Sequence, residues 1–295
     1  MSRVVAVLLI AAGIASGCGS SSSGTIASLL KRPGPDVAVT GGATSFVPGP
    51  VRFPFLVIAN DAKPVERPTA HVWVATSRDA RPFASTTAHL EPIGVPGRSA
   101  PAQGNLTKVY VAHFRIPLPG RYWLVAVPDG ARIQAVSVFE VQASLPVPTV
   151  GAKAPSSATP TLGSAPLAAL TTAVPPDREL LRDSVAGSLR AHEPFVVTFA
   201  TPRFCTSRVC GPVVDVVQAT ARHFSRSGIR FIHVEVYRDN DPSKGLNRWM
   251  RQWGLTTEPW TFLVGRDGRI KAEFEGSVSE AELVRAVRAQ LVSTQ

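Results

Sequence analysis

The chain has 295 residues, of which 44% are hydrophobic, so it is long enough to bury the cores of two domains. Its formal net charge is +10 at pH 7, and the basic residues, mostly arginine, are scattered along the chain. This pattern argues against single-stranded nucleic-acid binding, which uses basic grooves interleaved with aromatic residues. It fits a basic surface near anionic lipid better.

The N-terminus has the pattern of an export signal. Arg3 precedes a short apolar run, and small residues then lead to Cys18. The run is too short to span a membrane comfortably. The Ala-Ser-Gly-Cys ending resembles a bacterial lipobox, in which the cysteine becomes the lipidated first residue. We therefore expect a signal peptide at 1–17, lipidation of Cys18, a tether at 18–45, and anchoring at the extracytoplasmic face of a bacterial membrane. An ordinary secretory signal is the alternative.

Residues 46–143 contain short β-type runs separated by proline and glycine, several of them alternating apolar and polar residues. The clearest runs are 53–58, 71–75, 109–116, 122–127 and 135–141. Their spacing predicts an antiparallel sandwich. The stretch 117–123 resembles the turn into a late strand of immunoglobulin-like bacterial modules. We expect an all-β, immunoglobulin-like sandwich that serves as a spacer or docking module.

Two further regions follow the β-rich part. Residues 144–176 are rich in Pro, Ala, Ser and Thr, carry almost no charge and show no period, which predicts a semi-extended linker. Residues 177–295 alternate strand and helix patterns, which predicts an α/β domain. The expected elements are strands 195–199, 229–236, 260–265 and 269–274 and helices 212–226, 243–253 and 279–292.

Two of the three cysteines lie in this last domain, between its first strand and first helix. Cys210 directly precedes Gly211-Pro212, and proline is well tolerated in the first turn of a helix. The unpaired N–H groups and the dipole of a helix N-terminus favour a thiolate, so Cys210 is expected to be the more acidic thiol. Arg203 and Arg208 would add to this effect. We expect both Cys205 and Cys210 to be open to solvent.

The element order, with a cysteine at the first helix and a proline before the third strand, resembles the thioredoxin fold over about residues 189–291. The resemblance implies a cis peptide bond at Pro259, facing the cysteines, and substrate contacts at Glu258, Pro259 and Trp260. Cys210 begins a Cys-Gly-Pro-Val stretch that resembles the family's Cys-Gly-Pro-Cys with valine in place of the second cysteine. The partner thiol would then be Cys205.

A turn entering a helix can bring the Cα atoms of Cys205 and Cys210 within the ~4.4–6.8 Å that a disulfide needs, whereas an extended segment cannot. A bond across so short a loop is easily strained and easily reduced. Thr198 stands where many thioredoxins have a buried acid beneath the cysteines. Glu258 is expected to lie close enough to take its place.

These features predict a membrane-anchored thiol-disulfide oxidoreductase that acts on the thiols or disulfides of exported proteins through Cys205 and Cys210. The resemblance implies no cofactor and no metal. The helix position favours Cys210 as the nucleophile. Whether such a protein is an oxidant, reductant or isomerase is not set by the spacing of the cysteines.

Three alternatives stay open. The first is a redox-inactive thioredoxin-fold binding module with a structural disulfide. The second is a peroxidase, because residues 201–211 resemble the Thr-Pro-Gly-Cys-Thr stretch of peroxiredoxins. In that case Cys205 would attack peroxide and Cys210 would resolve the product. The third, a Sco-type copper chaperone, fits less well, because the cysteine spacing differs and no histidine stands near Pro259 in the sequence.

Overall fold

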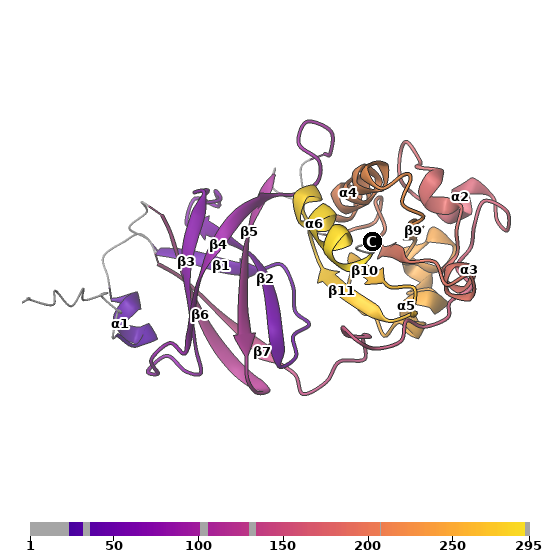
Figure 1. The fold of residues 1–295 in the computed structure, drawn as a ribbon. Coiled ribbons are helices and arrows are strands. Elements are labelled where there is room, and N and C mark those ends of the chain that lie inside the picture. The colour runs from indigo at the N-terminus through magenta and orange to yellow at the C-terminus, as the bar shows by residue number, and fades with distance from the viewer. Residues whose placement is uncertain (1–23, 32–35, 101–105, 130–133, 207, 293–295) are drawn as a thin grey trace, which may run out of the picture.

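The structure is a computed structural model that describes residues 24–31, 36–100, 106–129, 134–206 and 208–292. The predicted signal peptide and Cys18 lie outside these ranges. Within them, no helix combines the length and apolar character needed to cross a membrane. Figure 1 shows two parts, a β-barrel and an α/β domain, which lie against each other.

In the described residues, the N-terminal part is a closed β-barrel with strand order β1-β2-β5-β4-β3-β6-β7. Its strands are β1 (Asp36–Gly41), β2 (Gly49–Ala59), β3 (Thr69–Ala75), β4 (Ala84–Pro92), β5 (Lys108–Ile116), β6 (Gly120–Pro128) and β7 (Gln134–Val141). The barrel closes because β1 pairs with both β2 and β7, and β3 with both β4 and β6. The expectation of two separate sheets is therefore wrong. Full pairing leaves no open sheet edge.

Two barrel strands were not expected from the sequence. β1 and the short helix α1 (Ile26–Leu30) both fall in the predicted tether, so residues 24–45 are in part structured. α1 buries Ile26 and Leu29. β4 is rich in polar residues, and only Ala88 in it is buried. Ladder hydrogen bonds to β3 and β5 hold β4, and an apolar pattern cannot reveal them.

The expected linker does not hang free between the two parts. Residues 145–176, which we call the strap, lie along the second domain and include the short helix α2 (Leu167–Leu170). The amide of Gly151 donates to the carbonyl of Ile270, and the amide of Ile270 donates to Ala152, both at 2.9 Å. Ser157 is fully buried and accepts a hydrogen bond from the Trp253 indole at 3.0 Å. Backbone pairing and small side chains let this polar segment pack tightly.

The second domain is an α/β unit with sheet order β11-β10-β8-β9. Its strands are β8 (Phe195–Phe199), β9 (Arg230–Val234), β10 (Trp260–Val264) and β11 (Ile270–Glu275), and its helices are α3 (Val185–Arg190), α4 (Cys210–His223), α5 (Arg248–Gln252) and α6 (Glu280–Gln290). Short 3-10 helices span Glu179–Leu181, Arg238–Asn240 and Pro242–Lys244. β8 is parallel to β9 and antiparallel to β10.

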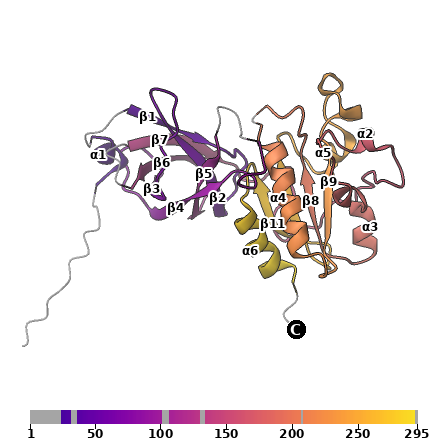
Figure 2. The ribbon, with the colours of Figure 1, turned by 90° about the horizontal axis from the view of Figure 1, so that it is seen from above.

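The two faces of this sheet bury different clusters, as its alternating side chains require. α4 and α6 pack together on one face of the sheet (Figure 2). Val196 of β8 belongs there to one buried cluster with Val213 and Leu283. Phe195 and Phe199 point to the opposite face, where α5 and the strap lie. The order of these elements along the chain, β8-α4-β9-α5-β10-β11-α6, is the one that the thioredoxin resemblance implied.

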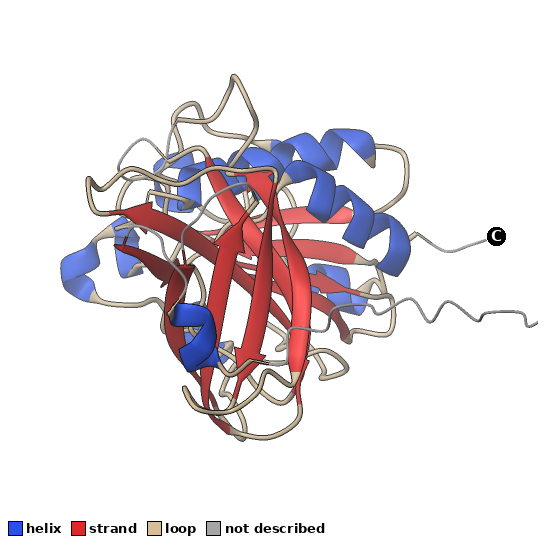
Figure 3. Ribbon diagram, turned by 90° about the vertical axis from the view of Figure 1, so that its left-hand side faces the viewer, coloured by secondary structure: helices blue, strands red, loops and turns tan. Residues whose placement is uncertain are grey.

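The barrel is docked on the second domain through charged and polar contacts. Figure 3 looks at the molecule from the barrel side, with the barrel strands in front. Arg52 of β2 donates to both carboxylate oxygens of Glu282 on α6, at 2.6 and 2.9 Å. Glu275, at the end of β11, accepts hydrogen bonds from the amides of Thr44 and Ser45 at 3.0 and 2.8 Å. Both side chains of the Arg52–Glu282 pair are nearly buried, with exposures of 12% and 10%.

The barrel also reaches the helix that begins at Cys210. Ser99 donates to the carboxylate of Asp215 on α4 at 2.7 Å. Val209, the residue before Cys210, packs against a cluster that contains Ile93 and Val109 of the barrel. The docking of the two parts therefore supports the segment that carries the cysteines.

Candidate functional site

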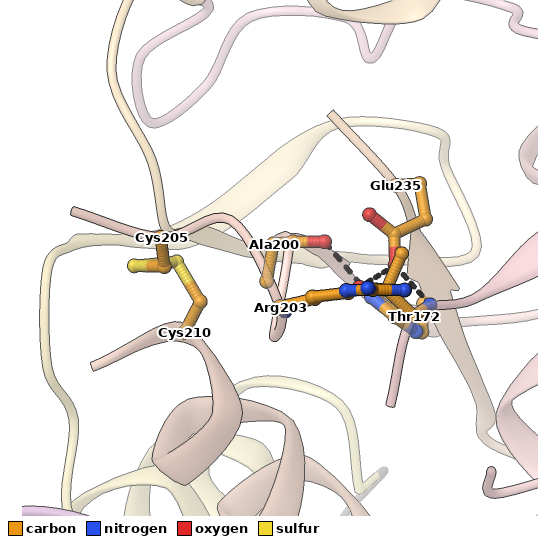
Figure 4. Close-up of a disulfide and its surroundings, with 7 residues drawn as sticks. Thr172, Ala200, Arg203, Cys205, Cys210 and Glu235 are labelled. Carbon is orange, nitrogen blue, oxygen red and sulfur yellow. Dashed lines mark hydrogen bonds between the residues drawn. A yellow bond between two sulfur atoms is a disulfide. The ribbon is translucent and has the colours of Figure 1, made fainter. Parts of the chain in front are cut away.

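Cys205 and Cys210 form a disulfide, with their Cα atoms 5.9 Å apart (Figure 4). The loop between them turns back because Arg208 adopts a left-handed conformation, with φ of 57°, and its amide donates to the carbonyl of Cys205 at 3.2 Å. Cys210 is the first residue of α4, and its N-cap, Val209, has no side-chain acceptor. The expected turn entering a helix, with a cysteine at the helix start, is therefore present.

Both sulfur atoms are less accessible than we expected. Cys210 is fully buried, and Cys205 is 8% exposed. Cys210 lies on the inward face of α4, in line with Val213, Val214 and Val217, so its side chain joins the core between α4 and α6. The expectation of an open pair is therefore wrong, and Cys205 is the more exposed residue of the two.

The two arginines of the loop, Arg203 and Arg208, are both exposed. The Arg203 guanidinium lies over the Phe204 ring, 5.4 Å from its centroid, and Figure 4 draws it on the side away from the sulfurs. Solvent screens exposed charges strongly. The electrostatic effect of Arg203 and Arg208 on the cysteines stays a prediction.

The turn before β10 brings a carboxyl group to the disulfide. The Glu258–Pro259 peptide bond is cis, as expected. A carboxylate oxygen of Glu258 and the sulfurs of Cys205 and Cys210 all lie within 4.8 Å of one another. Burial raises the pKa of Glu258. In the described part of the chain, its carboxylate has no hydrogen-bond or ion-pair partner.

Thr198 supplies no acid beneath the cysteines. The Thr198 hydroxyl is fully buried and lies 3.0 Å from the hydroxyl of Thr261, so this position holds a neutral pair instead of an acid. Tyr237 was not expected at the site. Its pKa is raised by burial and then by the charge of Glu258, and its ring meets Phe204 edge-on with centroids 6.5 Å apart.

Trp260 does not have the place expected for a substrate contact. Its side chain is only 3% exposed and stacks on Phe262, with centroids 5.5 Å apart. Its indole N–H donates to the Thr257 hydroxyl at 3.0 Å, so Trp260 stabilises the turn that precedes β10. The carbonyl of Pro259 already accepts from the amide of Gly276. Of the three predicted contacts, Glu258 is the one whose side chain faces the sulfurs.

The cysteine loop is also held by a chain of hydrogen bonds that the sequence did not predict, from Glu235 through Thr172 to the amide of Arg203. The Glu235 carboxylate, which is 5% exposed, accepts from the amide and hydroxyl of Thr172 at 2.5 and 2.8 Å. The Thr172 hydroxyl in turn accepts from the amide of Arg203 at 3.2 Å. His233 lies beside this chain, with Nε2 3.0 Å from the carbonyl of Ala200 (Figure 4). Thr172 was missed because its segment has the composition of a linker.

A groove of about 880 Å³ opens beside the cysteine loop. The strap forms one wall with residues from Thr171 to Asp177, and the loop forms another with Arg203 and Phe204. α4 contributes Pro212, and the barrel contributes Arg98. The groove is thus built by segments that only the tertiary structure brings together.

The chain is similar to a solved thiol:disulfide interchange protein of the thioredoxin family from Chlorobium tepidum. The alignment covers 50% of this chain and 97% of that one, with 16% identity and a TM-score of 0.32. No protein-family model and no curated protein matches the chain. A similarity of this size carries no functional argument, so the chemistry of the site rests on its own residues.

Proposed function

We propose that this protein is a thiol-disulfide oxidoreductase that acts on exported proteins from the extracytoplasmic face of a bacterial membrane. The observation that carries this proposal is the disulfide between Cys205 and Cys210 at the start of α4, opposite the cis turn at Glu258. Anchoring through a lipidated Cys18 is part of the proposal and is motivated by the sequence alone.

In the oxidising direction, a partner thiolate attacks the Cys205 sulfur, because Cys205 keeps some exposure whereas Cys210 is fully buried. The bond between the two cysteines breaks, and Cys210 leaves as a thiolate stabilised by the N-terminus of α4. A second partner thiolate then attacks the partner sulfur of the mixed disulfide, which releases Cys205 as a thiolate. Two electrons pass from the partner to the protein, and the partner's two thiol protons go to solvent or to the new thiols.

This mechanism revises the expected roles of the cysteines. The helix position makes Cys210 the better leaving group, but its complete burial keeps a protein partner from its sulfur. In the reducing direction the same geometry makes Cys205 the nucleophile and Cys210 the resolving thiol. The groove provides room for an extended partner segment along the cysteine loop, where Arg203, Phe204 and Gly211 line it.

The barrel fits a docking or spacer module of immunoglobulin type. Its strand order is that of a constant-type immunoglobulin domain, with the ABED and CFG halves joined at both seams. The Tyr122 hydroxyl donates to the carbonyl of Leu118 at 2.7 Å, which resembles the tyrosine corner of such domains. We propose that the barrel holds the redox domain in place relative to the membrane.

The test uses the chain from residue 18 onward with Cys18→Ser, because the strap and barrel pack on the redox domain. The protein is titrated with glutathione redox buffers and, separately, with hydrogen peroxide. Reversible thiol-disulfide exchange without peroxide consumption supports the proposal. Rapid peroxide turnover would support the peroxidase alternative, and a pair that stays oxidised under all buffers would support a structural disulfide. Cys205→Ser and Cys210→Ser are the controls.

A further inference from the structure

We propose that the dithiol form of this protein binds Zn²⁺ through Cys205, Cys210 and Glu258. The ligand atoms of these three residues lie within 4.8 Å of one another already in the disulfide form. They come from three separate segments: the loop after β8, the start of α4 and the turn before β10. The inference depends on the proposed function only in requiring that the disulfide can be reduced.

The distances suit a zinc ion once the disulfide opens. Zinc binds thiolate sulfur at about 2.3 Å and carboxylate oxygen at about 2.0–2.2 Å, so tetrahedral ligand atoms stand about 3.5–3.8 Å apart. Reduction separates the two sulfurs to about van der Waals contact, which is close to that spacing. The Glu258 oxygen needs to approach by about 1 Å at most, which side-chain rotation covers. The fourth position would hold water or a partner ligand.

Charge and burial favour a cation here. Reduction places two thiols beside a half-buried carboxylate that lacks a hydrogen-bond or ion-pair partner in the described residues. Ionising the thiols would gather three negative charges at a poorly solvated site, which is costly without compensation. Zn²⁺ compensates them as two S–H bonds are replaced by two Zn–S bonds and two protons are released to solvent.

The donor set decides the class of metal. Two thiolates select thiophilic ions over Ca²⁺ and Mg²⁺, which prefer oxygen ligands. The cluster contains no histidine in the described residues, and His233 is engaged at the carbonyl of Ala200. The site therefore differs from the two-cysteine, one-histidine set of the copper chaperone alternative. Because the oxidised pair has no free thiolate, binding is confined to the reduced state and competes with disulfide exchange.

Co²⁺ serves as the spectroscopic probe for the zinc site. The Cys18→Ser protein is reduced with a phosphine, desalted without oxygen and titrated with Co²⁺, followed by Zn²⁺ competition. We expect a thiolate-to-cobalt charge-transfer band, tetrahedral d–d bands, one ion per chain and two protons released. The oxidised protein should give none of these signals. Absence of the bands in the reduced protein, or failure of the phosphine to open the disulfide, would overturn the proposal.

Variants identify the third ligand. Glu258→Gln should weaken Co²⁺ and Zn²⁺ binding by at least about tenfold, and Glu258→Asp should restore part of the loss. Glu273→Gln, which removes a carboxylate outside the cluster, is the matched control and should bind as the parent does. Equal affinity in Glu258→Gln and the parent would remove Glu258 from the site. Exchange with glutathione but no metal binding would leave the proposed function intact and reject the zinc site alone.

Discussion

At the scale of single residues, the two cysteines differ in thiol acidity and in solvent exposure, and each property favours a different cysteine. Cys210 has the helix N-terminus, which favours its thiolate, but no exposed surface. Cys205 lacks the helix position, yet it is the cysteine of the pair that keeps some exposure. A thiolate that is never exposed cannot attack a large partner, so access decides which sulfur reacts first.

After reduction, we expect iodoacetamide to modify Cys205 at least about tenfold faster than Cys210. Mass spectrometry of quenched samples, with metal removed by a chelator, measures both rates in one experiment. The unfolded protein is the control, in which the two rates should be similar. Faster labelling of Cys210 would reverse the assignment of roles.

Glu273 is a half-buried carboxyl group outside the cysteine site. It lies in a cavity of about 310 Å³ between β11 and the barrel, and burial raises its pKa from 4.5 to about 7. Its Oε2 atom has no hydrogen-bond partner within the described structure. Arg52, His113 and Lys271 are the cationic groups that line the same cavity, and Glu275 is the acidic one.

In the pH range between its unfolded and folded pKa values, an acid with a raised pKa binds more protons in the folded state than in the unfolded state. Glu273 therefore lowers the free energy of unfolding as the pH rises from about 4.5 to about 7, and this contribution does not change further above that pH. Glu273→Gln should therefore be more stable than the parent at pH 8, by on the order of 2–3 kcal/mol, and nearly equal to it at pH 4.5. Urea unfolding at both pH values measures the difference. Glu140→Gln, at an exposed ion pair, should change stability by about 1 kcal/mol or less at both. A difference for Glu273→Gln that does not depend on pH would contradict this account.

At the scale of elements, the strap has the composition of a free linker but packs against the second domain. It lacks a period and is rich in proline, yet Thr172 within it connects the buried Glu235 to the cysteine loop. Such a contact depends on one hydroxyl at one position, so it leaves no pattern along the chain. The strap should therefore contribute to both stability and the order of the loop.

Thr172→Val keeps the side-chain shape but removes the hydroxyl from this chain of hydrogen bonds. Glu235 then loses one of its donors while it stays buried, and the amide of Arg203 loses its acceptor. We expect a loss of about 1–3 kcal/mol in the free energy of unfolding, together with faster reduction of the disulfide. Thr161→Val is the control in the same strap, since Thr161 bonds through its backbone groups. Equal effects from both variants would reject the specific role of Thr172.

At the scale of the whole molecule, the barrel and the second domain are joined by a nearly buried ion pair. Removing one partner of such a pair leaves the other charge uncompensated, which costs much more than the pair itself contributes. Arg52 and Glu282 should therefore couple the unfolding of the two parts. The same contact keeps α6, and through it α4, in a fixed position against the barrel.

Arg52→Ala should destabilise the protein by about 3–5 kcal/mol, and the two parts should then unfold in separate steps. Calorimetry resolves the number of transitions. Arg121→Ala, which breaks the exposed pair with Glu140, is the control and should cost about 1 kcal/mol or less. The double variant Arg52→Met, Glu282→Leu should recover much of the loss. A single transition with unchanged midpoint in Arg52→Ala would show that the pair does not couple the parts.

Several features followed from the sequence alone because they depend on local patterns. The strand Phe195–Phe199 was predicted with its exact bounds from an apolar, β-branched run, and the last helix from the capping pair Ser279 and Glu282. The position of Cys210 at a helix start follows from Gly211-Pro212 in the same way. These signals act over a few residues, so burial and periodicity report them directly.

Tertiary structure decided what local patterns cannot carry. The barrel closes because β1 pairs with β7, and the strap packs because its backbone hydrogen-bonds to Ile270 at the edge of β11. The burial of Cys210, the approach of Glu258 to both sulfurs and the docking through Arg52 all join residues far apart in the chain. Such contacts are set by shape, desolvation and hydrogen-bond partners in three dimensions. The sequence therefore determined where the cysteine pair stands along the chain, and the fold decided how deeply each cysteine is buried.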